Sequence, residues 1–255
     1  MEKSSPAGSA DARKTRIDGA QSRERLLHTA IRLFAEQGFA NTSTREIALA
    51  AGTNIAAISY YFGDKAGLYR AAFTEPSPNP VHDIAAFSAP DASLPEALAA
   101  FYTMLLAPLK QGDLTRLCMR LWYREMLEPT GLWHEKIDNG IKPAHAALIQ
   151  VLSRHLGVAQ PGDDMARLAF SVVGLAVQML LTREVIDSIS PQLLDGPQAI
   201  DTWQARLVMY AVAMIEAEGR RLAATTAAAP ERAASTAVAS QLAAPKSTAP
   251  QKRRP

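Results

Sequence analysis

The stretch TREIALAAGTNIAAISYYFGDK, residues 44–65, decides the fold that this sequence predicts. Apolar residues at helical spacing indicate one short helix over residues 44–51 and a second over residues 54–62, with a turn at Gly52 between them. Two short helices joined by a tight turn that contains glycine form a helix–turn–helix, whose second helix can enter the major groove of DNA. The spacing by itself is equally compatible with ordinary packed helices.

Helices on either side of this unit complete a small domain. Residues 22–37 carry an apolar stripe that ends at Gly38, and another helix is expected after Asp64, which can cap it. Ser43 or Thr44 can cap the helix over residues 44–51. We expect the following residues to face the core of the domain: Leu26, Leu27, Ala30, Ile31, Phe34, Ile47, Ala48, Ala51, Ile55, Ile58, Phe62, Leu68, Ala72 and Phe73.

The rest of the sequence predicts further helices and no strands. The segment EPSPNP, residues 75–80, contains three prolines, so no unbroken helix is expected from residue 65 to residue 90. Ser93 and Glu96 have the spacing of a capping box before a helix that reaches residue 106. Apolar stripes follow over residues 113–127, 132–156, 163–187 and 198–220. The prediction is an all-α fold of about nine helices, with a small helix–turn–helix domain before a larger helical domain.

Composition and charge divide the chain into four parts. Residues 1–18 and 222–255 have few large apolar side chains, which predicts a disordered N-terminal arm and a disordered basic tail. Between them we expect the small domain over residues 19–75 and the larger one over residues 82–221. The net charge is +3 over residues 1–70, −7 over residues 71–219 and +6 over residues 220–255. Basic ends on an acidic middle indicate that the ends approach a polyanion, although simple solvation explains the tail better.

Several kinds of chemistry find no support in the sequence. The one cysteine, Cys118, excludes an intramolecular disulfide and fits a reducing cytoplasm. We find neither a signal peptide nor an apolar run near the ~20 residues of a membrane span. The five histidines form no metal or catalytic cluster, and no phosphate-binding loop or nucleophile elbow is present. We therefore expect a cytoplasmic protein that is not an enzyme, with no catalytic residues, metal, cofactor or membrane partner.

Over about residues 21–73 the chain resembles the N-terminal domain of the TetR family of transcriptional regulators. The residues that carry the resemblance are Phe34 with Gly38 and Phe39, the run TREIA with the following AG, the aromatic-rich helix after it, and Lys65. Two further stretches, NIAAISYYFG followed by LY and REMLEPT at residues 124–130, resemble the CecR-like subgroup. The resemblance implies a partner, double-stranded DNA with a palindromic operator sequence.

Several contacts to the DNA backbone are implied by this resemblance. Thr44 and Arg45 occupy the start of the first helix of the motif, which contacts phosphate in such regulators. Tyr60 and Tyr61 match an aromatic pair that reaches the backbone, although one of the two could mainly pack. Lys65 stands at the start of the next helix, where its charge and the helix dipole both favour phosphate.

Base contacts are implied at the second helix of the motif. Asn54 opens this helix, where its amide can pair bidentately with adenine. Ala56 and Ala57 are small enough to touch thymine methyl groups, and Arg45 could add a guanine. Ser59 stands where many members of the family have tyrosine, so that contact is shortened or moved. We therefore expect A·T pairs to be favoured in the core of each half-site.

The same resemblance implies that the larger domain binds a small-molecule effector and forms a homodimer. Residues 163–187 and 198–220 would provide the dimer interface, although the first of these could instead be the buried central helix of a monomer. Aromatic and methionine side chains suit a plastic apolar pocket, although such residues at helical spacing more often form plain core. The pocket candidates are Met104, Cys118, Trp122, Met126, Trp133, His134 and Gln178.

The resulting hypothesis is a dimeric, ligand-responsive transcriptional regulator, most simply a repressor that an effector releases from its operator. Two other classes remain open on the sequence alone. One is an architectural DNA-binding protein that has no effector. The other is a helical ligand-binding protein whose N-terminal domain no longer binds DNA.

Overall fold

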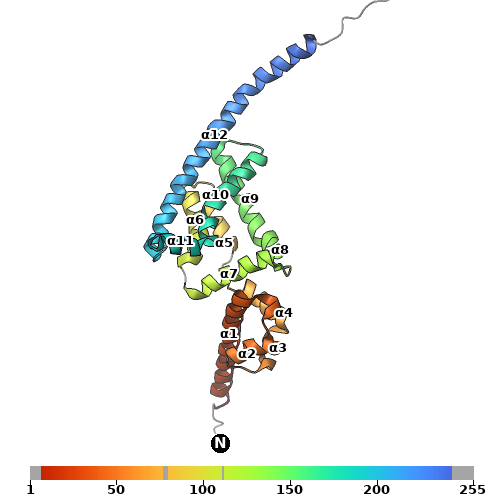
Figure 1. Ribbon diagram of the computed structural model, residues 1–255, viewed down its shortest axis with the longest axis vertical. Coiled ribbons are helices and arrows are strands. Elements are labelled where there is room, and N and C mark those ends of the chain that lie inside the picture. Colours follow the sequence, from red (N-terminus) through yellow and green to blue (C-terminus); the bar gives the residue numbers. More distant parts are fainter. Residues whose placement is uncertain (1–6, 77–79, 111, 243–255) are drawn as a thin grey trace, which may run out of the picture. The chain divides into compact units, whose positions relative to one another are not determined.

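The computed structural model describes residues 7–76, 80–110 and 112–242, and these residues form helices and no strand, so the all-α prediction is confirmed. The helices, shown in chain order in Figure 1, are α1 (Ala7–Asn41), α2 (Thr44–Ala50), α3 (Ile55–Phe62), α4 (Lys65–Thr74), α5 (Pro80–Phe87), α6 (Leu94–Lys110), α7 (Asp113–Leu127), α8 (Leu132–Lys136), a π-helical turn (Ile137–Ile141), α9 (Lys142–Leu156), α10 (Asp163–Leu181), α11 (Arg183–Ile189), a 3-10 turn (Pro191–Leu193) and α12 (Pro197–Leu242).

Three local features divide the chain more finely than the apolar stripes predicted. Helix α5 begins at Pro80, which suits a first helical position because proline has no N–H to leave unpaired there. The stripe over residues 132–156 is interrupted by the π-helical turn. The stripe over residues 163–187 breaks at Thr182, whose hydroxyl donates to the Gln178 carbonyl at 2.7 Å, a contact that often bends helices.

The predicted break after α4 is confirmed, because α4 ends at Thr74 and the next helix begins at Pro80. Residues 77–79 of the proline segment lie outside the described residues.

The two ends of the chain differ from the predicted disordered arms. Helix α1 begins at Ala7 and helix α12 continues to Leu242, although disorder was expected over residues 1–18 and 222–255. Both segments are rich in alanine, which has the highest helix propensity of all residues, so a helix can extend there without a core to pack on. Residues 1–6 and 243–255 lie outside the described residues.

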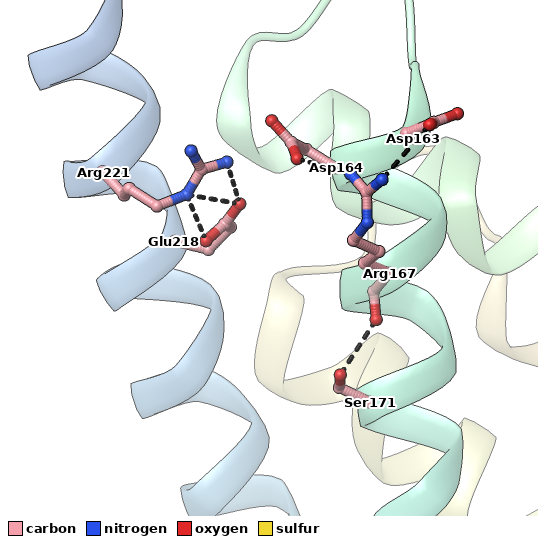
Figure 2. Close-up of polar contacts among 6 residues, drawn as sticks. All are labelled: Asp163, Asp164, Arg167, Ser171, Glu218 and Arg221. Atoms are coloured by element: carbon pink, nitrogen blue, oxygen red, sulfur yellow. Dashed lines mark hydrogen bonds and ion pairs between the residues drawn. The ribbon is translucent and has the colours of Figure 1, made fainter.

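Contacts along the chain separate two compact units, Met1–Ala211 and Val212–Pro255. The expected boundary between residues 75 and 82 lies inside the first unit, where α1 and α4 both pack against α7. Within the second unit, Arg221 pairs with Glu218 one turn earlier on α12, as Figure 2 shows.

The core of the N-terminal part is shared with α7 and α8. The expected inward residues of α1, α2 and α4 are buried, and Ile58 supplies the buried position of α3. Cys118 and Leu121 of α7 and Leu132 of α8 belong to the same apolar cluster, with Trp122 and Trp133 packed against it. The core beneath the helix–turn–helix therefore includes side chains from two helices that follow it by more than forty residues in the sequence, and α7 contacts α1 and α4.

Side-chain caps fix the short helices where the sequence predicted them. The Ser43 hydroxyl accepts from the Glu46 N–H at 3.1 Å, and the Asp64 carboxylate accepts from the Gly67 N–H at 2.7 Å. The Glu96 carboxylate accepts from the Ser93 hydroxyl at 2.6 Å and from the Ser93 N–H at 2.9 Å, and these two bonds, the hydroxyl bond first, hold the pKa of Glu96 below its usual value. These bonds satisfy backbone donors that a helix terminus otherwise leaves free.

A fully buried carboxylate connects α7 to its neighbours. Oε2 of Glu125 accepts from the Tyr69 hydroxyl of α4 at 2.7 Å. Oε1 accepts from the Thr130 N–H at 2.8 Å and from the Trp133 N–H of α8 at 3.3 Å. A buried charge is tolerated only when its hydrogen-bonding sites are filled, so α4, the turn after α7 and α8 must keep their places together. Burial, followed by the bond to Glu125, raises the pKa of Tyr69, which keeps its hydroxyl a neutral donor.

Contacts at the rim reinforce this junction. Nη2 of Arg124 donates to the Glu36 carbonyl near the end of α1 at 3.1 Å. Gly38 has a φ of 83°, a backbone conformation that side chains with a Cβ rarely adopt, so the kink there favours glycine. Nε1 of Trp122 donates to the Phe73 carbonyl at 3.2 Å. The ends of α1 and α4 are thus both bonded to α7.

The larger part packs around α6, which contacts α5, α7, α9 and α10. The Tyr102 hydroxyl of α6 donates to the Val172 carbonyl of α10 at 3.0 Å. Among the described helices, α10 has the length and apolar composition to cross a membrane. Its inward face packs against α6 and α9, however, and its first turn carries Asp163 and Asp164 with Arg167 between them (Figure 2), as in a helix of a protein core.

Replacement of Tyr69 by phenylalanine tests the buried carboxylate. Tyr69→Phe removes one donor from Glu125 without changing the ring, so the free energy of unfolding should fall by about 1–2 kcal/mol in a urea titration. Tyr60→Phe is the matched control, because Tyr60 is 81% exposed and its change should stay within about 0.5 kcal/mol. Equal effects of the two substitutions would contradict the role of Glu125.

Candidate nucleic-acid interface

Helix α3 has a packed face and an outward face. Ile58 is 2% exposed and Phe62 packs against the core, as predicted for both. The expectation that Ile55 is core is wrong, because 49% of its surface is exposed. Ile55 lies at the margin between the two faces and on the open first turn of the helix, where no preceding turn covers it.

The outward face of α3 is uncharged. Its exposed residues are Ile55, Ala56, Ser59 and Tyr60, which recur at helical spacing, and Ala57 is half-buried. Tyr60 projects into solvent, whereas Tyr61 packs against the core and makes an edge contact with the Tyr60 ring at 4.9 Å between centroids. The expectation that one of the two tyrosines mainly packs is therefore met by Tyr61.

Asn54 is the N-cap of α3. Its Oδ1 accepts from the Ala56 N–H at 2.9 Å, and its backbone is extended, as capping requires. The predicted pairing with adenine needs the same oxygen as an acceptor and the amide group as a donor in one plane. The cap bond orients the amide plane and uses one of the two acceptor sites of Oδ1.

Cationic groups stand on either side of α3 in the sequence and in the fold. Arg45 is exposed on the first turn of α2, next to the half-buried Thr44. Lys65 is the first residue of α4, and its Nζ lies 3.5 Å from the Ala40 carbonyl and 4.5 Å from the centroid of the Phe39 ring. Because these contacts hold the ammonium group in place, Lys65 offers a positioned charge at a helix N-terminus, which favours a phosphate.

Sequence reasoning missed two features of this region. Leu49 of α2 is 81% exposed, so a second large aliphatic side chain reaches solvent from the helix–turn–helix. Arg23 of α1 lies 4.9 Å from the centroid of the Phe62 ring and pairs with Glu75 at 2.5 Å, which ties the ends of α3 and α4 to α1. The sequence did contain a signal for this contact, because Arg23 is a charged residue that lies in line with the apolar stripe of the first helix.

The predicted effector-pocket residues are distributed over four helices, α6, α7, α8 and α10. Cys118, Trp122 and Trp133 belong to the core that α7 and α8 share with the N-terminal helices. Burial raises the pKa of the Cys118 thiol to about 11, which fits a small buried side chain. Met104 is half-buried on α6, whereas three candidates are exposed, on α7, α8 and α10: Met126, His134 and Gln178.

The arrangement of acidic and histidine side chains gives no sign of catalysis. The acid pair at the start of α10 is bonded to Arg167, at 3.2 Å from Asp163 and 3.0 Å from Asp164 (Figure 2). Within the part of the chain that the structure describes, no group of three or more His, Cys, Asp or Glu side chains could hold a metal ion.

Two family models match the chain. The model "Bacterial regulatory proteins, tetR family" matches residues 26–72, and the model of the C-terminal domain of "HTH-type transcriptional dual regulator CecR" matches residues 94–218. The CecR protein of Shigella flexneri is 30% identical over 181 residues, which cover 67% of this chain and 80% of that protein. The regulator AcrR of the same organism is 45% identical over 58 residues, 23% of this chain and 27% of that protein.

Solved structures share the fold at lower identity. A regulatory protein of the tetR family from Rhodococcus RHA1 has a TM-score of 0.56 and 20% identity, over 76% of this chain and 96% of that one. A HlyIIR variant with a replaced loop segment has a TM-score of 0.53 and 22% identity, over 74% of this chain and 96% of that one.

The family predicted from the helix–turn–helix residues is thus confirmed over both parts of the chain, and the matching relatives are transcriptional regulators, not enzymes. The chain belongs to the TetR family of bacterial transcriptional regulators, in the group that carries a CecR-type C-terminal domain.

Proposed function

We propose that this DNA-binding regulator is a cytoplasmic repressor that binds a palindromic operator as a homodimer and is released by a small-molecule effector. The observation that carries the proposal is the exposed, uncharged face of α3, which lies between the cationic residues Arg45 and Lys65. A helix that lacks charge can lie close to base edges, while cations outside it hold the phosphates.

The contacts in the complex divide by chemistry. Thr44, Arg45, Tyr60 and Lys65 would bind the sugar–phosphate backbone, and Tyr61, which packs against the core, would support the Tyr60 ring. Their contacts set affinity and register but carry no sequence information.

Readout of bases would fall to the outward face of α3, which includes Ala56, Ala57 and Ser59. Asn54, which caps α3, would hold the first turn of the helix in the orientation that presents this face. Arg45 remains able to reach a guanine at the edge of the half-site.

Dimerisation would use the exposed apolar side chains of α10 and of the first part of α12. Phe170 is 65% exposed on α10, and Met209 and Tyr210 are 48% and 46% exposed on α12. Exposed aromatic and methionine residues on the helices predicted for the interface are what a partner would cover. A two-fold dimer presents two copies of α3 to successive turns of one DNA face, which requires an inverted repeat.

An effector would act in the larger part of the chain. Four buried polar atoms have no hydrogen-bond partner among the described residues: the Tyr123 and Ser153 hydroxyls, His145 Nε2 and Trp203 Nε1. Unpaired buried polar groups are costly, so a bound molecule that pairs with them is stabilised. Burial lowers the pKa of His145. The shared core of α7 with α1 and α4 gives a route from there to the DNA-binding helices.

Selection of genomic fragments by the purified wild-type protein tests the proposal as a whole. The selected fragments should share an inverted repeat, and sedimentation should show two protomers on each site. Retention of fragments without a common sequence would support an architectural protein instead. A selected duplex of this kind also serves in the experiments below.

The phosphate contact of Lys65 predicts a change in salt dependence. Lys65→Met removes the charge but keeps the apolar stem, so the slope of log Kobs against log salt should fall by about 2 for two protomers. Fluorescence anisotropy at several salt concentrations measures this slope. Lys142→Met, on the exposed part of α9, should leave it unchanged, and an unchanged slope in Lys65→Met would refute the contact.

The cap at Asn54 predicts a different pattern for two substitutions. Asn54→Ser keeps a capping oxygen, so both the stability and the base preference at each operator position should resemble the wild type. Asn54→Ala should lower the free energy of unfolding by about 1 kcal/mol. The base preference is measured on a set of single-base operator variants. If Asn54→Ser loses the preference for an A·T pair, Asn54 contacts a base directly.

A further inference from the structure

The outward face of α3 carries one large aliphatic side chain, that of Ile55. About half of the surface of Ile55 is exposed, whereas Ile58 of the same helix is buried in the core. A single exposed aliphatic residue is ordinary on a protein surface. Ile55 differs because it is the first residue of the recognition helix, and N-terminal residues of such helices are the ones that contact base edges.

Hydrogen bonding gives this end of α3 little means to discriminate bases. No Arg, Lys, Asp or Glu occurs from Asn54 to Phe62, and Oδ1 of Asn54 is bonded to the Ala56 N–H. The hydroxyls of Ser59 and Tyr60 lie one turn or more beyond Ile55 on the same face. Apolar contact is therefore the means of base readout that Ile55 itself can supply at the first turn.

Thymine is the base that offers an apolar group in the major groove, its C5-methyl. We infer that Ile55 is a specificity-determining residue that selects a thymine by packing on this methyl group. The small side chain of Ala56 beside it lets the helix approach closely enough for that contact. This inference rests on the proposed operator binding and names the group that the first turn of α3 recognises.

Deoxyuridine substitution isolates the methyl group, because uracil has the same hydrogen-bonding edge as thymine. Each thymine of one half-site in the selected duplex is replaced singly, and the dissociation constant is measured for the full-length wild type and for Ile55→Ala. At one thymine the wild type should lose about fourfold in affinity, the ratio that corresponds to burial of one methyl group. Ile55→Ala should bind the parent duplex more weakly and show no further loss at that thymine.

Two variants control the comparison. Ile55→Val keeps a branched side chain and should retain part of the sensitivity to uracil. Ser59→Ala lies on the same face but leaves Ile55 in place, so it should retain the full sensitivity at that thymine. Circular dichroism melts and sedimentation establish that each variant is folded and has the assembly state of the wild type.

Different outcomes overturn the thymine contact of Ile55 and the proposed operator binding. A wild type that tolerates uracil at every position, or an Ile55→Ala variant with the sensitivity of the wild type, overturns the inference and leaves operator binding intact. Failure to select any common sequence overturns the proposed function itself.

Discussion

One buried carboxylate, that of Glu125, joins α4, α7 and α8. Its oxygens accept hydrogen bonds from α4, from the turn after α7 and from α8, at a site without access to solvent. A carboxylate in that position is stable only while all these donors stay in reach. Helix α3 of the helix–turn–helix packs against α4, and α4 packs against α7, which contacts α8. The position of the motif therefore depends on the positions of α7 and α8. A small domain that contains two very short helices gains from this support an order that its own core could not supply.

This support explains how a nearly uncharged helix can serve a DNA-binding regulator. In the proposed complex, the charges that attract DNA stand outside α3, and the lysine among them is held by a carbonyl and an aromatic ring. The helix would present alanine, serine, tyrosine and one isoleucine to the groove. Affinity and selectivity are then carried by different residues, which fits the general division between phosphate and base contacts.

Much of the fold followed from local patterns in the sequence, because caps, glycine stops and apolar spacing act over a few residues. Ser43, Asp64 and the pair Ser93–Glu96 cap as predicted. Ile55 was misassigned because apolar spacing does not reveal whether the first turn of a helix is covered. The bond between Tyr69 and Glu125 joins residues 56 positions apart, so no local pattern could indicate it. The place of Cys118, Trp122 and Trp133 in the core shared with the N-terminal helices was equally beyond local reasoning.

Amide hydrogen exchange in Glu125→Gln tests most directly whether this carboxylate holds α4 and α8 together. Glutamine has the same shape but replaces one acceptor oxygen by a donor, so it cannot accept from both sides. The account predicts faster exchange in α4 and in residues 130–136 together, relative to the wild type, with exchange in α9 and α10 unchanged. Faster exchange confined to residues 127–136, with α4 as well protected as in the wild type, would contradict it.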